Sequence, residues 1–212
     1  MGNREARILM DESRMTRGMI RTMADQTEKP ESPEGIGLRM LQTRTVLVSG
    51  AVDEKLAEKT MMQLLILDAE NHEPIRVMIT SQGGHVDSGF AIHDMLGFIE
   101  SPVTTIGAGW VASIAVPILF GAPKERRFSL PHTRFLLHQP TGGAGGQASD
   151  IRIEAEEILK VRERLNRLIA DETGQDFERV DKDSDRNFWM DAEQAQAYGL
   201  VSQVVTRVTE IG

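Results

Sequence analysis

The sequence predicts an α/β fold in which a largely parallel sheet is covered by helices. Short runs of aliphatic and β-branched residues alternate along the chain with longer amphipathic stretches of helical period. Glycine and proline mark most of the boundaries between them, as is typical of repeated β-α units. In sheets of this kind, functional groups lie beyond the carboxyl ends of the strands, so we expect the site there.

The expected strands are short apolar runs bounded by turn residues. They cover residues 45–48, 75–79, 103–106, 127–130, 134–137 and 201–205. The expected helices follow an apolar period of about 3.6 residues and cover residues 53–70, 87–99, 113–120, 147–172 and 191–198. Gly174 stops the longest helix, and Asp191 with Gln194 three residues on forms a capping box that opens the last one.

The N-terminal segment differs in composition from the rest of the chain. We therefore expect an arm over residues 1–37, partly mobile, and a single domain over residues 38–212. Residues 28–35 contain two prolines and three glutamates without an apolar period, a composition typical of a linker. Four methionines before it are four or five residues apart, which indicates a short amphipathic helix: Met10, Met15, Met19 and Met23.

Composition excludes several classes of function. The chain has no cysteine, so disulfide scaffolds, cysteine-ligated metal sites and thiol catalysis are removed, and the five histidines show no metal-ligand spacing. The net charge of −8 argues against a nucleic-acid partner, because phosphate binding needs clustered Lys and Arg. No apolar run approaches the ~18 residues that span a bilayer. Charged residues interrupt the N-terminus, so we expect no signal peptide and a cytoplasmic protein without a membrane partner.

Four segments carry residue types suited to acyl transfer. Residues 81–84 (SQGG) join a strand to a helix and are either an oxyanion-binding turn or an ordinary turn. Ser113 follows a Gly-rich connection at a helix start, where it is either an exposed nucleophile or a helix-capping serine. His138 ends an apolar strand and is either a general base or a structural histidine. The charged run over 181–190 is a solvated loop, or it supplies a polar side chain that orients the histidine.

Several short segments follow one another in a specific order and spacing. They are residues 79–84 (ITSQGG), 109–114 (GWVASI), 137–143 (LHQPTGG), 146–151 (GQASDI), 157–160 (EILK), 173–174 (TG), 191–195 (DAEQA) and 198–200 (YGL). In this order they resemble the Clp protease proteolytic subunit (ClpP) family over about residues 46–205. The resemblance implies the crotonase-like fold, a spiral of β-β-α units that forms a head. It also implies a handle over about 141–172, made by a Gly-rich strand near 141–146 and the long helix.

The resemblance also implies a role for each candidate residue. Ser113 would be the nucleophile and His138 the general base, and the amides of Gly84 and Ile114 match the oxyanion hole. The implied activity is that of a serine endopeptidase in an ATP-dependent protease, which hydrolyses unfolded proteins in a chamber enclosed by two stacked heptamers. The implied partner is a ring-shaped AAA+ unfoldase that uses the ATP, so we expect no cofactor in this chain.

The third catalytic position departs from the family. Counted back from residues 198–200 without gaps, the position of the catalytic aspartate holds Asn187, which offers no full negative charge to His138. We therefore expect an atypical Ser-His-Asn triad with low or conditional activity, and Asp185 is a substitute candidate for the third residue. The sequence does not decide between rings made of this chain alone and rings mixed with a paralogue. The alternatives are a weak structural or regulatory subunit that pairs with an active paralogue, and a crotonase-fold acyl-CoA hydratase or isomerase.

Overall fold

The computed structural model describes residues 33–143 and 145–211. The chain divides into two compact units, Met1–Arg39 and Met40–Gly212. The methionines of the expected amphipathic helix lie outside the described residues. Helix α2 (Pro33–Gln42) begins inside the stretch that was expected to be a linker, because proline is favoured at the first position of a helix, where its missing N–H is not needed.

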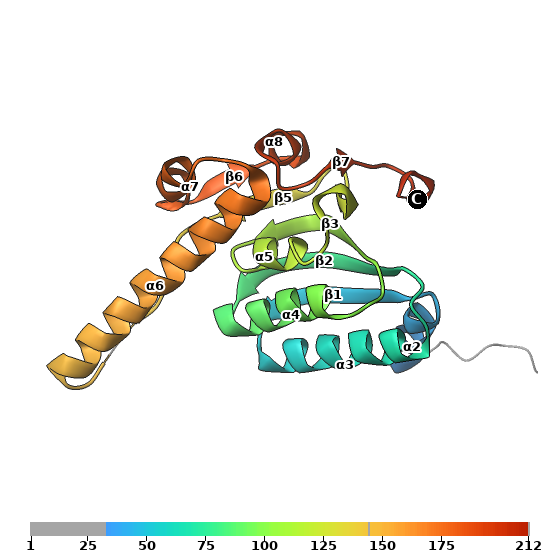
Figure 1. Ribbon diagram of the computed structural model, residues 1–212, viewed down its shortest axis with the longest axis horizontal. Coiled ribbons are helices and arrows are strands. Elements are labelled where there is room, and N and C mark those ends of the chain that lie inside the picture. The colour runs from blue at the N-terminus through green and yellow to red at the C-terminus, as the bar shows by residue number, and fades with distance from the viewer. Residues whose placement is uncertain (1–32, 144, 212) are drawn as a thin grey trace, which may run out of the picture. The chain divides into compact units, whose positions relative to one another are not determined.

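The second unit is built on a seven-stranded sheet (Figure 1). Parallel neighbours run in the order β1 (Thr45–Val52), β2 (Ile75–Gly84), β3 (Val103–Ala112), β4 (Arg127–Ser129) and β7 (Gln203–Val204). The C-terminal part of β3 pairs instead with β5 (Arg134–Leu137), which is also parallel to it. β6 (Phe188–Met190) then adds antiparallel to β5. The strands β2, β3 and β5 therefore end side by side.

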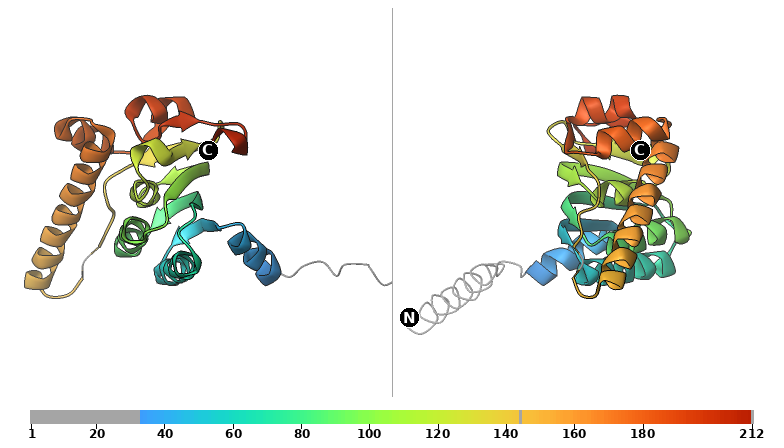
Figure 2. Two further views of the ribbon diagram at one scale, coloured as in Figure 1. Left: turned by 45° about the vertical axis from the view of Figure 1, so that its right-hand side comes forward. Right: turned by 90° about the vertical axis from the view of Figure 1, so that its left-hand side faces the viewer.

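Helices follow most of the parallel strands. They are α3 (Glu54–Glu70), α4 (Val86–Phe98), α5 (Ala115–Leu119), α6 (Ala148–Thr173), α7 (Phe177–Ser184) and α8 (Ala192–Tyr198), with 3₁₀ turns at Lys124–Arg126 and Val208–Glu210. α3, α4 and α5 lie next to one another on one side of the sheet, while α6 extends away from it (Figure 2). Strands and helices bury a main apolar core around side chains such as Ile92, Ile118 and Phe135, and a smaller apolar cluster contains Ile106, Phe128 and Val205.

Two further properties concern only residues 33–143 and 145–211. No helix there is long and apolar enough to cross a membrane. No group of three or more His, Cys, Asp or Glu side chains in that part of the chain is placed to hold a metal ion.

The α/β fold is confirmed, and the main corrections concern where elements end. β2 and β3 continue through the glycine-containing segments that were expected to be connections, because the parallel strands beside them continue the pairing. Irregularities between Ser49 and Ala51 and between Ile79 and Ser81 shift the register, as bulges do. The last parallel strand, β7, is shorter than the expected range of 201–205. The capping box of Asp191 and Gln194 is present, and Gly174 ends α6 in the left-handed conformation, as expected.

Two predicted segments are wrong. The Gly-rich stretch forms no strand over its described residues, 141–143 and 145–146, because no neighbouring strand of the described chain pairs with it. The handle of this chain is therefore α6 with an irregular segment. The charged run over 181–190 is not a solvated loop, since it contains the end of α7 and all of β6. Val180 and Ser184 form the buried face of α7. The many charged residues around them make this face hard to recognise in the sequence.

Candidate active site

Ser113 stands directly after β3 in an uncommon backbone conformation. Its φ is +56°, in the left-handed region that residues other than glycine rarely adopt. Its N–H donates to the carbonyl oxygen of Leu136 at 2.9 Å, which ties it to β5. α5 begins only at Ala115, with Ile114 as its N-cap residue, so the interpretation of Ser113 as a helix cap is wrong. Such a turn between strand and helix is typical of nucleophilic residues in hydrolases.

The last residues of β2, 81–84, bend where Gly83 adopts a positive φ, and this glycine turn within the strand packs against the Ser113 backbone. Gly83 has a φ of +86°, and a Cβ on it would lie 2.6 Å from the carbonyl oxygen of Ala112 and 2.7 Å from the Ser113 Cβ. The buried Ser81 hydroxyl holds the turn by accepting a hydrogen bond from the Gly83 N–H at 3.0 Å. Only glycine permits this close approach. Residues 81–84 belong to β2, so the expectation of a turn that joins strand to helix is wrong, while the oxyanion role of the segment stays a prediction.

The two amides expected to form an oxyanion hole belong to residues at neighbouring strand ends. Gly84 is the last residue of β2, and Ile114 directly follows Ser113. A Cβ on Gly83 would lie 3.2 Å from the Ile114 nitrogen, and one on Gly84 would lie 2.3 Å from the carbonyl oxygen of Val52. Both glycines are therefore enclosed by backbone, and the glycine turn lies beside the Ile114 amide.

Replacement of Gly83 by alanine is expected to lower the free energy of unfolding by about 1–3 kcal/mol, because the new Cβ meets backbone and φ is positive. Chemical denaturation measures the change. Gly97→Ala is the matched control: Gly97 lies in α4 with open space around it, and alanine there is expected to leave stability unchanged or slightly higher. Equal stabilities for the two variants would contradict the close packing of the glycine turn.

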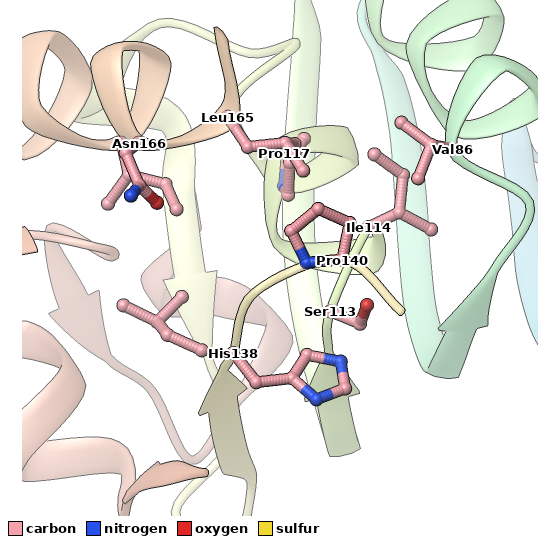
Figure 3. A pocket seen from close by; sticks show the side chains of 10 residues that line it. Val86, Ser113, Ile114, Pro117, His138, Pro140, Leu165 and Asn166 are labelled. Atoms are coloured by element: carbon pink, nitrogen blue, oxygen red, sulfur yellow. The ribbon is translucent and has the colours of Figure 1, made fainter. Parts of the chain in front are cut away.

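His138 follows β5 and lines the same cavity as Ser113. Because β3 and β5 are parallel neighbours paired through Ala112 and Leu136, the residues after their ends lie close together. The cavity has a volume of about 20 Å³, and its wall is mostly apolar, with Val86, Ile114, Pro117, Leu165 and Ile169 among its side chains. Figure 3 shows the His138 imidazole beneath Ser113, whose hydroxyl points away from the ring in this view. The structure therefore brings these two predicted residues together without aligning them.

Asn187 lies across from His138, just before β6. β5 and β6 are paired through Leu137 and Phe188, so His138 and Asn187 face each other one step beyond that pair. Asn187 is exposed and does not line the cavity. In the described part of the chain, no hydrogen bond joins any two of the side chains Ser113, His138 and Asn187. The third predicted residue is thus near the second but not engaged with it.

The carboxylate of Asp185, the substitute candidate for the third catalytic residue, lies near two arginines. Its Oδ1 lies 3.8 Å from Arg162 Nη2, and its Oδ2 lies 4.0 Å from Arg186 Nε. Its backbone carbonyl accepts a hydrogen bond of 2.8 Å from the Gln139 side chain. The structure does not bring the Asp185 carboxylate to His138.

Sequence reasoning missed Asn166. This residue of α6 is 2% exposed and lines the cavity with Ser113 and His138. The available signal was its position on the helix, where it adjoins Leu165 and lies three residues before Ile169, on a stripe that is mostly apolar. A buried amide on an apolar stripe must be hydrogen-bonded, and this indicates a specific polar partner.

A serine beside a histidine at the ends of parallel strands, with a glycine turn against the serine, is the arrangement of a serine-type hydrolase. The family model for Clp protease matches residues 28–208. The chain belongs to the Clp protease family, and it is a proteolytic subunit with serine-type endopeptidase activity.

Individual members of this family are similar to the chain over most of their length. The chain is 48% identical to ATP-dependent Clp protease proteolytic subunit 3 of Rhizobium meliloti, over 91% of this chain and 100% of that protein. It is 51% identical to subunit 2 of Gluconobacter oxydans, over 82% of this chain and 78% of that protein. The solved structure of ClpP1 from Listeria monocytogenes is 45% identical, with a TM-score of 0.75 over 84% of this chain and 99% of that one. An asparagine-to-aspartate mutant of that ClpP1 gives a TM-score of 0.78. The ClpP fold is thereby confirmed.

Proposed function

We propose that Ser113 is the nucleophile, His138 the general base and Asn187 the residue that orients it, with the amides of Gly84 and Ile114 as the oxyanion hole. The observation that carries the proposal is the cavity that Ser113 and His138 share at neighbouring strand ends. Ser113 Oγ attacks the scissile carbonyl as His138 takes its proton, and the two amides bind the developing oxyanion. His138 then gives the proton to the leaving amine, and water hydrolyses the acyl-enzyme.

The proposed activity is low or conditional. Asn187 can accept the Nδ1–H of His138 and hold the imidazole tautomer, but its amide is uncharged. The imidazolium that forms during attack therefore lacks a carboxylate to stabilise it. The absence of a hydrogen bond among the three described side chains supports this, although such bonds often tighten only when substrate is bound. Contacts that press β6 toward His138 are then expected to raise the activity.

The proposed substrates are unfolded proteins, hydrolysed in the cytoplasm inside a chamber of two stacked heptamers. A ring-shaped AAA+ unfoldase delivers them and uses the ATP, while this chain needs no cofactor and no nucleic acid. Membership of the Clp protease family supports this assembly, because its members pair with Clp ATPases and form rings. Further support comes from α6, whose exposed apolar side chains suit contact with another subunit: Ile151, Ile153 and Leu159.

A second candidate is a weak structural or regulatory subunit in mixed rings with an active paralogue. The unaligned side chains and the uncharged Asn187 favour it. Two relatives carry the subunit numbers 3 and 2 in their names. In this candidate, most turnover belongs to the paralogue, and Ser113 contributes little.

Reaction of the full-length protein with a fluorophosphonate tests the proposal. Mass-spectrometric mapping is expected to place the label on Ser113, with the Ser113→Ala variant unlabelled under the same conditions. Labelling of Ser113 only after mixing with an active Clp proteolytic subunit would show that the activity is conditional on mixed rings. Turnover in such a mixture that is unchanged by Ser113→Ala in this chain would favour the second candidate. Absence of label on Ser113 both alone and in such a mixture would contradict the assignment of the nucleophile.

A further inference from the structure

A polar cluster joins α6 to α7 beside the candidate active site. Asp181 Oδ1 lies 2.9 Å from Arg162 Nη2 and accepts a hydrogen bond of 2.8 Å from Asn166 Nδ2. Ser184 Oγ donates to Asn166 Oδ1 at 3.0 Å. Asn166 and Ser184 are 2% and 1% exposed, so the bond between them is protected from water, whereas the bond from Asn166 to Asp181 is only partly buried. The partner that the buried Asn166 requires is thus supplied by α7.

The cluster reaches His138 through the next residue, Gln139. The Gln139 backbone N–H donates to the Ser184 carbonyl oxygen at 2.6 Å, and its side chain donates to the Asp185 carbonyl oxygen at 2.8 Å. Its side-chain oxygen also accepts a bond of 3.5 Å from Arg162 Nη1. These bonds fix the backbone that carries the imidazole.

The same contacts fix the segment that leads to Asn187. α7 ends at Ser184, and residues 185–186 connect it to Asn187 and β6. Because Gln139 binds the carbonyls at 184 and 185, it holds this connection against the end of β5. His138 and Asn187 are therefore carried by two backbone segments whose separation depends on how α7 sits on α6.

We propose that Asp181 is a positioning residue for the catalytic site, an inference that rests on the proposed function. One carboxylate oxygen of Asp181 holds Arg162 and Asn166 of α6 at the same time. It therefore sets the placement of α7 that brings the Ser184 carbonyl to the Gln139 N–H. Through these residues Asp181 keeps His138 opposite Asn187, without contacting either.

The distances identify Asp181 as the main partner of Arg162. It lies 2.9 Å from the guanidinium, whereas the other nearby carboxylate, Asp185, lies 3.8 Å away. The Nε of Arg162 is buried and has no hydrogen-bond partner among the described residues, so the Nη groups make the polar contacts of the guanidinium. The side chains of Arg162 and Asp181 are 24% and 43% exposed, so solvent screens part of their attraction. A charge-assisted bond is still stronger than a neutral one, and its loss is expected to loosen α7.

The Asp181→Asn variant tests the proposal in the full-length protein. The amide keeps the size of the side chain and can still accept from Asn166, but it removes the charge that holds Arg162. We expect the kcat for peptide hydrolysis and the rate of fluorophosphonate labelling at Ser113 to fall by about 10- to 100-fold, the effect of a small misplacement. KM is expected to change by less than about twofold, because an interaction used mainly in the transition state is lost.

Asp183→Asn is the matched control, since it removes the same charge from the same helix. Asp183 Oδ2 accepts from the Tyr198 hydroxyl at 3.1 Å and lies 3.6 Å from Arg179 Nε. Burial and the Asp183 carboxylate raise the pKa of Tyr198, so the phenol keeps the proton that it donates. Asp183→Asn is therefore expected to lower the unfolding temperature with kcat unchanged.

The outcomes separate the two proposals. If both variants lower kcat equally, Asp181 has only a structural role and the inference is overturned. If Asp181→Asn is labelled at Ser113 as fast as the native protein, the inference about Asp181 is overturned while the proposed function stands. If native protein is not labelled at Ser113, alone or in mixed rings, the proposed function fails and takes this inference with it.

Discussion

Replacement of Ser113 by alanine is expected to lower the kcat for peptide hydrolysis by at least about 10³-fold. No other residue that lines the cavity carries a hydroxyl, and the chain has no cysteine to replace it. The proposed oxyanion amides and the bound substrate would remain, so only the slow attack by water is left. Under the proposed mechanism, covalent catalysis at this cavity depends on the Ser113–His138 pair, because the chain has no cysteine.

Initial rates with a fluorogenic peptide at saturating concentration measure this loss. Because alanine keeps the Cβ, the positive φ at position 113 is retained, and the free energy of unfolding is expected to change by less than about 0.5 kcal/mol. Ser49→Ala removes an exposed hydroxyl from β1 and is expected to leave kcat unchanged. Residual turnover above a few per cent in Ser113→Ala would show that another group carries the reaction.

The sequence patterns predict which elements exist better than they predict where those elements end. The apolar run at 75–79 identifies β2, but the strand continues to Gly84 because β1 and β3 remain beside it. That continuation depends on neighbours that are distant in the chain, and the glycines within it are normally signs of a turn. α7 was missed for a related reason, because the two residues that it buries lie among many charges.

The candidate site was predictable to the extent that it follows from parallel strands. Ser113 and His138 each follow a strand, and the parallel pairing of β3 and β5 brings them to one cavity. The contacts of Asp181 and Asn166 were not predictable, because they depend on how α7 packs on α6. No local pattern reports that packing, and the charge at Asp181 is consistent with simple solvation until the structure places it.

Replacement of Asn187 by aspartate is expected to raise kcat by at least about tenfold, within the limit of ~10⁴ set by the reverse change in a serine protease. The pairing of Leu137 with Phe188 places position 187 opposite His138, so the carboxylate lies where it can accept the Nδ1–H. A full negative charge then stabilises the imidazolium that forms during attack.

Two comparisons show whether the gain passes through the proposed triad. In the Ser113→Ala background, Asn187→Asp is expected to give no gain, because the stabilised imidazolium has no nucleophile to serve. Asp185→Asn distinguishes the substitute candidate, whose carboxylate lies 3.8 Å from Arg162. If Asp185 were the residue that orients His138, replacing it by asparagine would lower the kcat of the native protein at least as strongly as Asn187→Asp is expected to raise it. Asn187→Asp would then give no increase in kcat. An unchanged kcat in Asn187→Asp would remove Asn187 from the triad, because a carboxylate held opposite His138 cannot leave the rate unaltered.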